Sequence, residues 1–158
     1  MSSPIVLRAW QALTRIPLGK RVFTRAICFK APYFGSIRPR FVELGPGHCV
    51  ATVPKHRAIT NHLGTIHAIA LCNLAELAGG IMTEASVPPT HRWIPKGMTV
   101  EYLKKAGTDV RARAYFDRMP DFGDEGFELP AQIEIADRAG DAVFRGTITM
   151  WISPRKRG

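Results

Sequence analysis

The chain has 158 residues, of which 46% are hydrophobic, so it can form one domain with a full core and is not expected to be disordered. Its net charge is +9, and no acidic residue precedes Glu43. The three cysteines have neither CxxC nor metal-ligand spacing, which argues against a disulfide framework or a zinc site and indicates a reducing, cytoplasmic setting.

The N-terminal third predicts two helices and a pair of strands. Apolar side chains recur at intervals of three and four residues within 4–16, which is typical of an amphipathic helix. Pro17 and Gly19 end that pattern. The elements expected next are a short helix over 19–30, a turn or extended link over 31–35, and strands over 38–44 and 48–54 joined by a turn at 45–47.

The sequence from residue 65 onward predicts one helix that is followed only by strands. Residues 65–85 are apolar nearly all round a helix, so we expect this helix to be buried. Within 109–116 apolar residues alternate with Arg111 and Arg113, which indicates a strand with one packed and one wetter face. The expected strands are 92–104, 108–118, 129–138 and 141–152, the last two joined by a tight hairpin.

The order of these elements predicts the fold class. The sequence contains no strand–helix–strand alternation, so we expect an α+β protein with an antiparallel sheet. One very apolar helix beside many amphipathic strands indicates a sheet wrapped around one long buried central helix, with extra N-terminal helices outside it.

One carboxylate is unusual in this pattern. Glu76 lies inside the apolar helix, where burying an ionised side chain without partners is costly. Near His67 and Ala68 the helix start offers free N–H groups and the positive end of the helix dipole, which could hold a carbonyl oxygen as it becomes an oxyanion. Glu76 could then attack the carbonyl or activate a water, and Asn61 could position either group.

Each of these residues also has a structural interpretation. Asn61 could cap a turn, His67 could be a core histidine, and Glu76 could pair with a core arginine such as Arg113.

Helix geometry limits how the candidate residues can cooperate. His67 and Glu76 are nine residues apart, so they point to opposite sides of the helix and lie roughly 13 Å apart along its axis. They cannot act on one small atom within a single chain. If both serve one reaction, a two-fold dimer with antiparallel central helices would supply two composite sites.

The string Asn61-His62-Leu63-Gly64-Thr65-Ile66-His67, with an acidic residue nine positions after the histidine, resembles the PaaI-like hotdog-fold acyl-CoA thioesterases. The layout is similar to the DUF4442 branch of that superfamily. The resemblance covers about 31–153 and implies a hotdog core there, with 1–30 as a helical extension of a single domain over 1–158.

The resemblance also implies an active site. Asn61, His67 and Glu76 would occupy the family's catalytic positions, with Glu76 as nucleophile or general base. The Ala68 N–H would be the oxyanion donor, and Gly64 and Thr65 would contact the substrate. The resemblance further implies dimers or tetramers, and no metal or cofactor beyond the coenzyme A of the substrate.

Two positions depart from the family pattern. His67-Ala68-Ile69 stands where the family usually has His-Gly-Gly, and Pro95 stands where a serine or threonine is common. Lys96 could replace that hydroxyl group. Lys104 and Lys105 follow a strand and could meet coenzyme A phosphates.

The expected function is hydrolysis of an acyl-CoA or a related thioester at a site between subunits. The missing glycines favour an alternative, a non-catalytic protein that binds or senses acyl-CoA; a hotdog dehydratase is a further possibility. The basic N-terminal segment could contact nucleic acid, an anionic membrane surface or coenzyme A, or be a solvated surface. Because the chain contains no nucleic-acid-binding motif, nucleic acid is not an expected partner.

Overall fold

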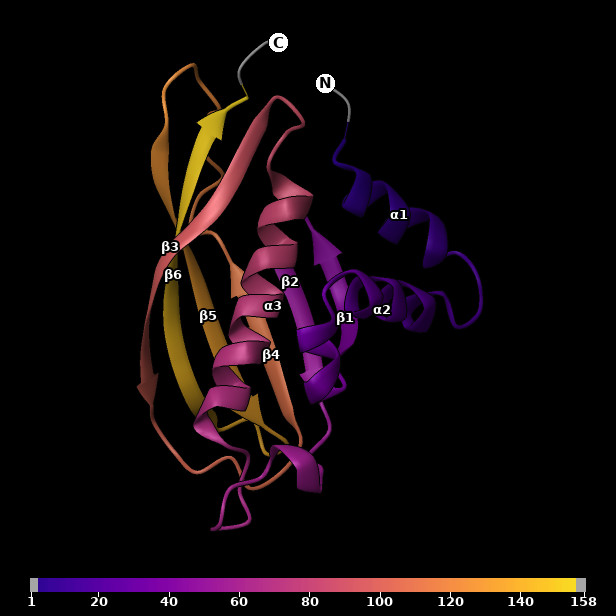
Figure 1. Ribbon diagram of the computed structural model, residues 1–158, viewed down its shortest axis with the longest axis vertical. Coiled ribbons are helices and arrows are strands. Elements are labelled where there is room, and N and C mark those ends of the chain that lie inside the picture. Colours follow the sequence, from indigo (N-terminus) through magenta and orange to yellow (C-terminus); the bar gives the residue numbers. More distant parts are fainter. Residues whose placement is uncertain (1–2, 156–158) are drawn as a thin grey trace.

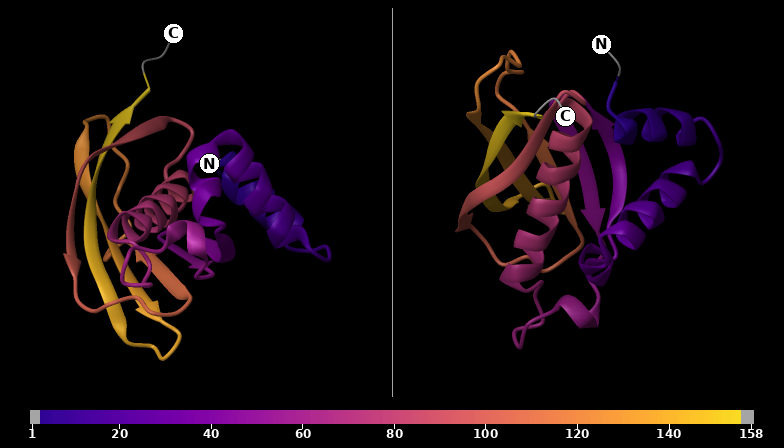
Figure 2. Two further views of the ribbon diagram at one scale, coloured as in Figure 1. Left: turned by 60° about the horizontal axis from the view of Figure 1, so that its bottom comes forward. Right: turned by 45° about the horizontal axis from the view of Figure 1, so that its top comes forward.

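The computed structural model describes residues 3–155. The strands of this part are β1 (Arg40–Gly45), β2 (His48–Val53), β3 (His91–Tyr102), β4 (Val110–Tyr115), β5 (Phe127–Asp137) and β6 (Ala142–Pro154). They form one antiparallel sheet in the order β1-β2-β4-β5-β6-β3, so β1 and β3 are its edges. The sheet curves around one long helix, α3 (Ala68–Ser86), which lies against its concave face (Figures 1 and 2).

α3 packs on the sheet and also contacts α1 (Ile5–Leu13) and η1 (Pro32–Ile37), so most of its residues are buried. Leu74, Leu77 and Met82 are fully buried, and a Cβ atom on Gly79 would come within 3.0 Å of Ile148 Cδ1. Glu76, by contrast, is exposed in the single chain. The predicted burial of the central helix is confirmed for most of its residues. Glu76 is an exception, and there the carboxylate keeps its hydration and avoids the cost of burial.

The length of α3 raises a second interpretation. With 19 residues it is, by length and composition alone, apolar enough to cross a membrane. However, 56% of its most apolar stretch is buried within the protein. The packing against the sheet accounts for its apolar composition.

The predicted alternation in β4 is confirmed. Val110, Ala112 and Ala114 are buried, whereas Arg111 and Arg113 are exposed. Because successive side chains of a strand point to opposite faces, the small buried residues face α3 and the arginines face outward. β4 lies between β2 and β5, so this register extends into the middle of the sheet.

Two helices, α1 (Ile5–Leu13) and α2 (Gly19–Lys30), confirm the predicted N-terminal helices and stand beside the sheet as a separate lobe (Figures 1 and 2). Aromatic contacts join this lobe to the body. The ring centroids of Trp10 and Phe23 are 5.1 Å apart, and those of Phe23 and Phe41 are 5.4 Å apart. The lobe thus packs on β1 through the same core as the sheet.

The segment after α2 differs from its prediction. Residues 31–35 were expected to be a turn or extended link, but 32–37 form a 3₁₀ helix, η1 (Pro32–Ile37). Pro32 stands at its first position, where a fixed φ suits a helix and no N–H donor is needed. A second short 3₁₀ helix, η2 (Arg57–Ile59), follows β2.

The predicted fold class is confirmed. The chain is α+β, with a six-stranded antiparallel sheet around one long central helix and additional N-terminal helices. The predicted elements shift at their ends. α3 begins at Ala68 instead of residue 65, and β5 begins at Phe127 instead of residue 129.

Candidate active site

The loop before α3 is organised by the side chain of Asn61. Its Oδ1 accepts hydrogen bonds from the backbone N–H groups of Leu63 (3.0 Å) and Thr65 (3.2 Å), and its Nδ2 donates one to Thr65 Oγ1 (3.0 Å). Gly64 supplies the positive φ of 73° that this tight loop requires. In this structure Asn61 therefore shapes the loop, which is the turn-forming role considered as its structural alternative.

α3 begins at Ala68 because His67 caps it. The backbone of His67 is extended, and its ring Nδ1 accepts a hydrogen bond from the Ile69 N–H (3.1 Å). Its carbonyl oxygen accepts a further bond from the Ala70 N–H (2.9 Å). His67 is exposed, so it is not a core histidine.

These bonds leave one donor free in the first turn. Within residues 3–155 the Ala68 N–H has no hydrogen-bond partner, whereas the N–H groups of Ile69 and Ala70 are both used. A free N–H at the positive end of a helix dipole can stabilise an oxygen that gains negative charge. This is the atom that the sequence predicted as oxyanion donor.

A cleft of about 300 Å³ lies at this end of α3, and we call it the helix-start cleft. It brings together three of the predicted site residues around the helix start, Asn61, Thr65 and Ala68. Lys104 and Lys105 line the same cleft from the segment after β3. Gly64 and His67 support this arrangement through the backbone and the cap.

Tyr102 is a lining residue of the cleft that the sequence reasoning missed. Its hydroxyl lies 3.2 Å from Cys72 Sγ on α3. That hydrogen bond, together with burial, raises the pKa of Tyr102. The one available signal was its place at the end of β3, two residues before Lys104.

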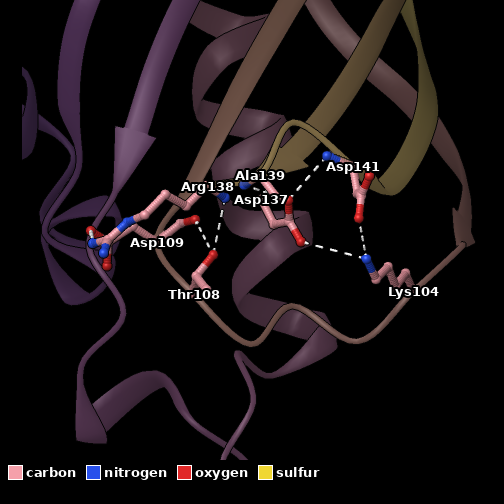
Figure 3. Close-up of polar contacts among 7 residues, drawn as sticks. All are labelled: Lys104, Thr108, Asp109, Asp137, Arg138, Ala139 and Asp141. Atoms are coloured by element: carbon pink, nitrogen blue, oxygen red, sulfur yellow. Dashed lines mark hydrogen bonds and ion pairs between the residues drawn. The ribbon is translucent and has the colours of Figure 1, made fainter.

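Lys104 is held by carboxylates at the hairpin between β5 and β6. Figure 3 shows its ammonium group directed toward Asp141 and Asp137. The hydrogen bond that Lys104 Nζ donates to the Asp141 carboxylate raises the pKa of Lys104. Asp137 also accepts hydrogen bonds from the backbone N–H groups of Ala139 and Asp141, at 2.9 and 3.0 Å. A substrate phosphate would therefore compete with Asp141 for Lys104, whereas Lys105 forms no ion pair within residues 3–155.

Glu76 lies in a different hollow, of about 400 Å³, which we call the Glu76 hollow. Most of its lining is apolar and comes from several elements: Val6, Ile27, Phe34, Leu77, Gly80, Ile81, Trp93, Pro95 and Met150. In the described part of the chain Glu76 forms no hydrogen bond or ion pair. The alternative pairing with Arg113 is wrong for the single chain, since that guanidinium lies 4.8 Å from the Tyr115 ring centroid on β4.

A second carboxylate of the Glu76 hollow was missed. Glu84 lies two turns further along α3, and its Oε2 accepts a hydrogen bond from Trp93 Nε1 at 2.6 Å. The helical spacing from Glu76 was the signal that could have found it. Glu84 is anchored by the indole, whereas Glu76 is left available.

Pro95, a departure from the family pattern, and Lys96, the suggested replacement for the hydroxyl group, lie on different faces of the sheet. Pro95 lines the Glu76 hollow. Lys96 occupies a bulge in β3, hydrogen-bonds to Glu128 and lies 5.3 Å from the Trp151 ring centroid. These partners hold Lys96 away from Glu76, so it does not take the place of a hydroxyl at position 95 in one chain.

The helix-start cleft and the Glu76 hollow share no lining residue. The free Ala68 N–H and the free Glu76 carboxylate therefore belong to separate hollows of α3, in agreement with the nine-residue spacing that points His67 and Glu76 to opposite sides of the helix. Among residues 3–155 no cluster of three or more histidine, cysteine or acidic side chains is placed to hold a metal ion.

Comparison with solved structures gives the same fold. A structural-genomics crystal structure is 46% identical and covers 95% of this chain and 99% of its own, with a TM-score of 0.81. A protein of unknown function from Pseudomonas aeruginosa, described as a probable thioesterase, is 24% identical, covers 78% of this chain and 88% of its own, and has a TM-score of 0.72. A thioesterase from Haemophilus influenzae is 16% identical. The match covers 79% of this chain and 85% of the thioesterase, with a TM-score of 0.68.

These structural neighbours confirm the predicted hotdog fold. No curated protein matches the chain significantly. The family model of a domain of unknown function, DUF4442, matches residues 19–152, which is most of the chain and includes α3 and every residue that lines its two hollows except Val6. The chain is therefore a member of the DUF4442 family, and its fold is the hotdog fold of PaaI-like thioesterases.

Proposed function

We propose that this protein hydrolyses an acyl-CoA or a related acyl thioester. The observation that carries the proposal is that α3 presents a free backbone donor, the Ala68 N–H, and an unpaired carboxylate, Glu76. Thioester hydrolysis needs a donor for the developing oxyanion and a group that attacks or activates water. The thioesterases that share this fold support the assignment.

The Glu76 hollow suits the acyl part of such a substrate. Its lining is largely apolar, and the carboxylate stands among those side chains. An apolar pocket with few polar groups is typical of a small-molecule site. The acyl chain would lie along Leu77, Ile81 and Trp93, with its carbonyl carbon toward Glu76.

The site would be completed by a second copy of the chain. β3 is an edge strand that pairs with β6 on one side, and its Ile94 and Met98 side chains are exposed. An unpaired edge with apolar side chains favours pairing with another strand. A two-fold dimer along β3 would set the α3 helices antiparallel and bring the Ala68 end of one protomer toward Glu76 of its partner.

In the proposed mechanism Glu76 and the Ala68 N–H have different roles. Glu76 activates a water, or attacks the carbonyl carbon itself, while the oxygen gains negative charge beside the Ala68 N–H. Collapse of the tetrahedral intermediate then breaks the carbon–sulfur bond, and the leaving thiolate takes up the proton that Glu76 removed from the water. If Glu76 attacks the carbonyl carbon itself, collapse leaves a mixed anhydride on Glu76, which a water cleaves to the carboxylic acid and the free Glu76 carboxylate while the thiolate is protonated. Asn61 acts as a positioning residue, since its bonds hold the loop that precedes the helix start.

The test is thiol release from acyl-CoA substrates of different chain lengths by the purified protein. Glu76→Gln should lower the rate by about 100-fold or more, because the amide can neither attack nor accept a proton. Glu125→Gln, in an exposed loop, is the matched control and should leave the rate unchanged. Full activity of a folded Glu76→Gln protein would remove Glu76 from the mechanism.

A second candidate function is acyl-CoA binding without turnover, favoured by Ala68-Ile69 in place of two glycines. In that case acyl-CoA should raise the melting temperature of the protein while no thiol appears. The same panel of acyl-CoA substrates separates the two functions.

A further inference from the structure

The outer face of α2 carries an exposed apolar row that the proposed reaction does not use. Leu18, at the cap of α2, is 65% exposed, Val22 is 49% exposed and Phe29 is 90% exposed. With Arg25, these positions recur at intervals of four, three and four residues, so they lie along one face of the helix. The opposite face of α2 packs inward through Phe23. We call Leu18, Val22 and Phe29 the α2 row.

A basic hollow adjoins this row. A cavity of about 650 Å³ lies between α2 and the start of β1, and no acidic residue lines it. Its cationic lining residues are Lys20, Arg21, Arg25, Arg38 and Arg40. We call this cavity the basic hollow. Arg21 and Arg25 precede Val22 and Phe29 closely on the helix, so positive charge borders the α2 row.

The basic side chains of this region are not neutralised by ion pairs in the part of the chain that the structure describes. No acidic residue precedes Glu43, and none of the basic side chains before it forms an ion pair within residues 3–155. Glu43 itself pairs with Arg111, at 3.0 Å. The region is therefore complementary to an external anionic surface.

The backbone around this surface is strained at two places. In the described part of the chain the non-glycine residues with positive φ are Leu18 (62°) and Arg38 (51°). Such backbone conformations are costly for residues with a Cβ atom and often mark functional positions. Leu18 contributes to the α2 row, and Arg38 lines the basic hollow.

We propose that α2 docks this protein onto an anionic phospholipid membrane surface. The α2 row enters the boundary between headgroups and acyl chains, and lipid phosphates are held by the arginines of the basic hollow. The α1–α2 connection, which projects from the body in Figure 2, lies beside this surface and adds the exposed side chain of Ile16.

A second copy of this chain is a poorer occupant of the same surface. Two copies that met through α2 would bring their uncompensated basic side chains together, and like charges at an interface oppose association. An anionic lipid layer supplies both the apolar medium for the α2 row and the negative charge for the basic hollow. The proposal does not depend on catalysis at α3.

The test is flotation of the full chain with vesicles at moderate salt. One set contains phosphatidylglycerol and phosphatidylcholine in equal parts, and the other contains phosphatidylcholine alone. We expect binding to the anionic set only, weakened by added salt. The Arg21→Gln/Arg25→Gln variant should bind about 25-fold more weakly, since each basic side chain near the surface contributes about fivefold.

The apolar part of the docking surface is tested separately. Leu18→Ser/Phe29→Ser should reduce vesicle binding at least roughly tenfold because less apolar surface enters the membrane. Both side chains are exposed, so the fold should persist, as circular dichroism and the melting temperature would verify. Arg118→Gln/Arg145→Gln, with the same change of charge on exposed residues outside the lobe, is the matched control and should bind like the parent.

Three outcomes would overturn the proposal. Equal binding to neutral and anionic vesicles would contradict the role of charge, and no binding to either would contradict docking altogether. A change of oligomeric state in Leu18→Ser/Phe29→Ser, with vesicle binding absent in the parent, would assign the α2 row to contact between copies of the chain.

Discussion

The helix-start cleft and the Glu76 hollow are both built on α3, yet they are organised in opposite ways. At the helix start, hydrogen bonds from Asn61 and His67 fix the loop and the first turn, and one donor is left over. In the Glu76 hollow, apolar side chains set the shape, and the carboxylate forms no ion pair with the residues that the structure describes. One helix thus carries a backbone donor in a hydrogen-bonded polar segment at its end and a carboxylate in an apolar pocket along its side.

The largest effect is expected at Ala68, whose substitution tests the role assigned to the helix-start cleft in contrast to the Glu76 hollow. Ala68→Pro removes only the free N–H, because proline is tolerated at the first position of a helix and the extended backbone of His67 suits a residue before proline. If the helix start supplies the oxyanion donor, the rate of thiol release should fall by about 100-fold to 1,000-fold with little change in melting temperature.

Ala68→Gly is the control for this experiment, because it keeps the N–H and introduces the glycine common in the family. It should retain activity. An active Ala68→Pro protein would assign the oxyanion to another donor.

The Glu76 hollow is tested by filling it. Gly80 lines the hollow on the exposed side of α3, where a Cβ atom would meet Trp93 at 3.4 Å. Gly80→Leu should reduce kcat/KM for long acyl chains by roughly tenfold relative to short ones, since the added side chain takes acyl space. Measurement of kcat/KM across chain lengths would check this.

Ala12→Leu, at an exposed position of α1, is the matched control and should leave the chain-length profile unchanged. An equal loss for short and long acyl chains in Gly80→Leu would place the acyl group outside the hollow.

The polar organisation of the helix start is tested at Asn61. Asn61→Ala removes the side-chain bonds to Leu63 and Thr65, so the free energy of unfolding should fall by about 1 kcal/mol. Urea unfolding would measure this change. His62→Ala, at an exposed position of the same loop, should have almost no effect. Equal stability of both variants would contradict the role of Asn61 in shaping the loop.

The smallest effect is expected at Asp109, which belongs to the network of polar contacts in Figure 3. Hydrogen bonds from the Lys55 N–H and from Arg138 lower the pKa of Asp109. A carboxyl group whose pKa is lower in the folded state stabilises the fold above its unfolded-state pKa, and this contribution is lost as the pH falls through the folded-state value.

Asp109→Asn should therefore be slightly less stable than the parent near neutral pH, and the difference should shrink in acid. Thermal unfolding between neutral pH and the acid range would measure the difference, with Asp124→Asn in an exposed loop as the control. A difference that stays constant with pH would show that the Asp109 charge is not involved.

The sequence by itself determined the elements whose patterns are strong. Alternation in 109–116 predicted β4, the apolar stretch after Thr65 predicted α3, and the order of elements predicted an antiparallel sheet around that helix. The spacing between His67 and Glu76 also predicted that they point to opposite sides of the helix and cannot act on one atom within a single chain, because helix geometry is fixed by residue number. Local periodicity carries this information without knowledge of the tertiary contacts.

Other features were decided only by the tertiary structure. The exposure of Glu76 depends on which side of α3 the sheet covers, and a helix that is apolar all round does not reveal that side. Lys96 was separated from Glu76 by a bulge in β3, and Glu84 was tied to Trp93 by strand placement. These are contacts between distant residues, which depend on how the sheet curves and which edge strand lies beside the helix, and no local pattern encodes them.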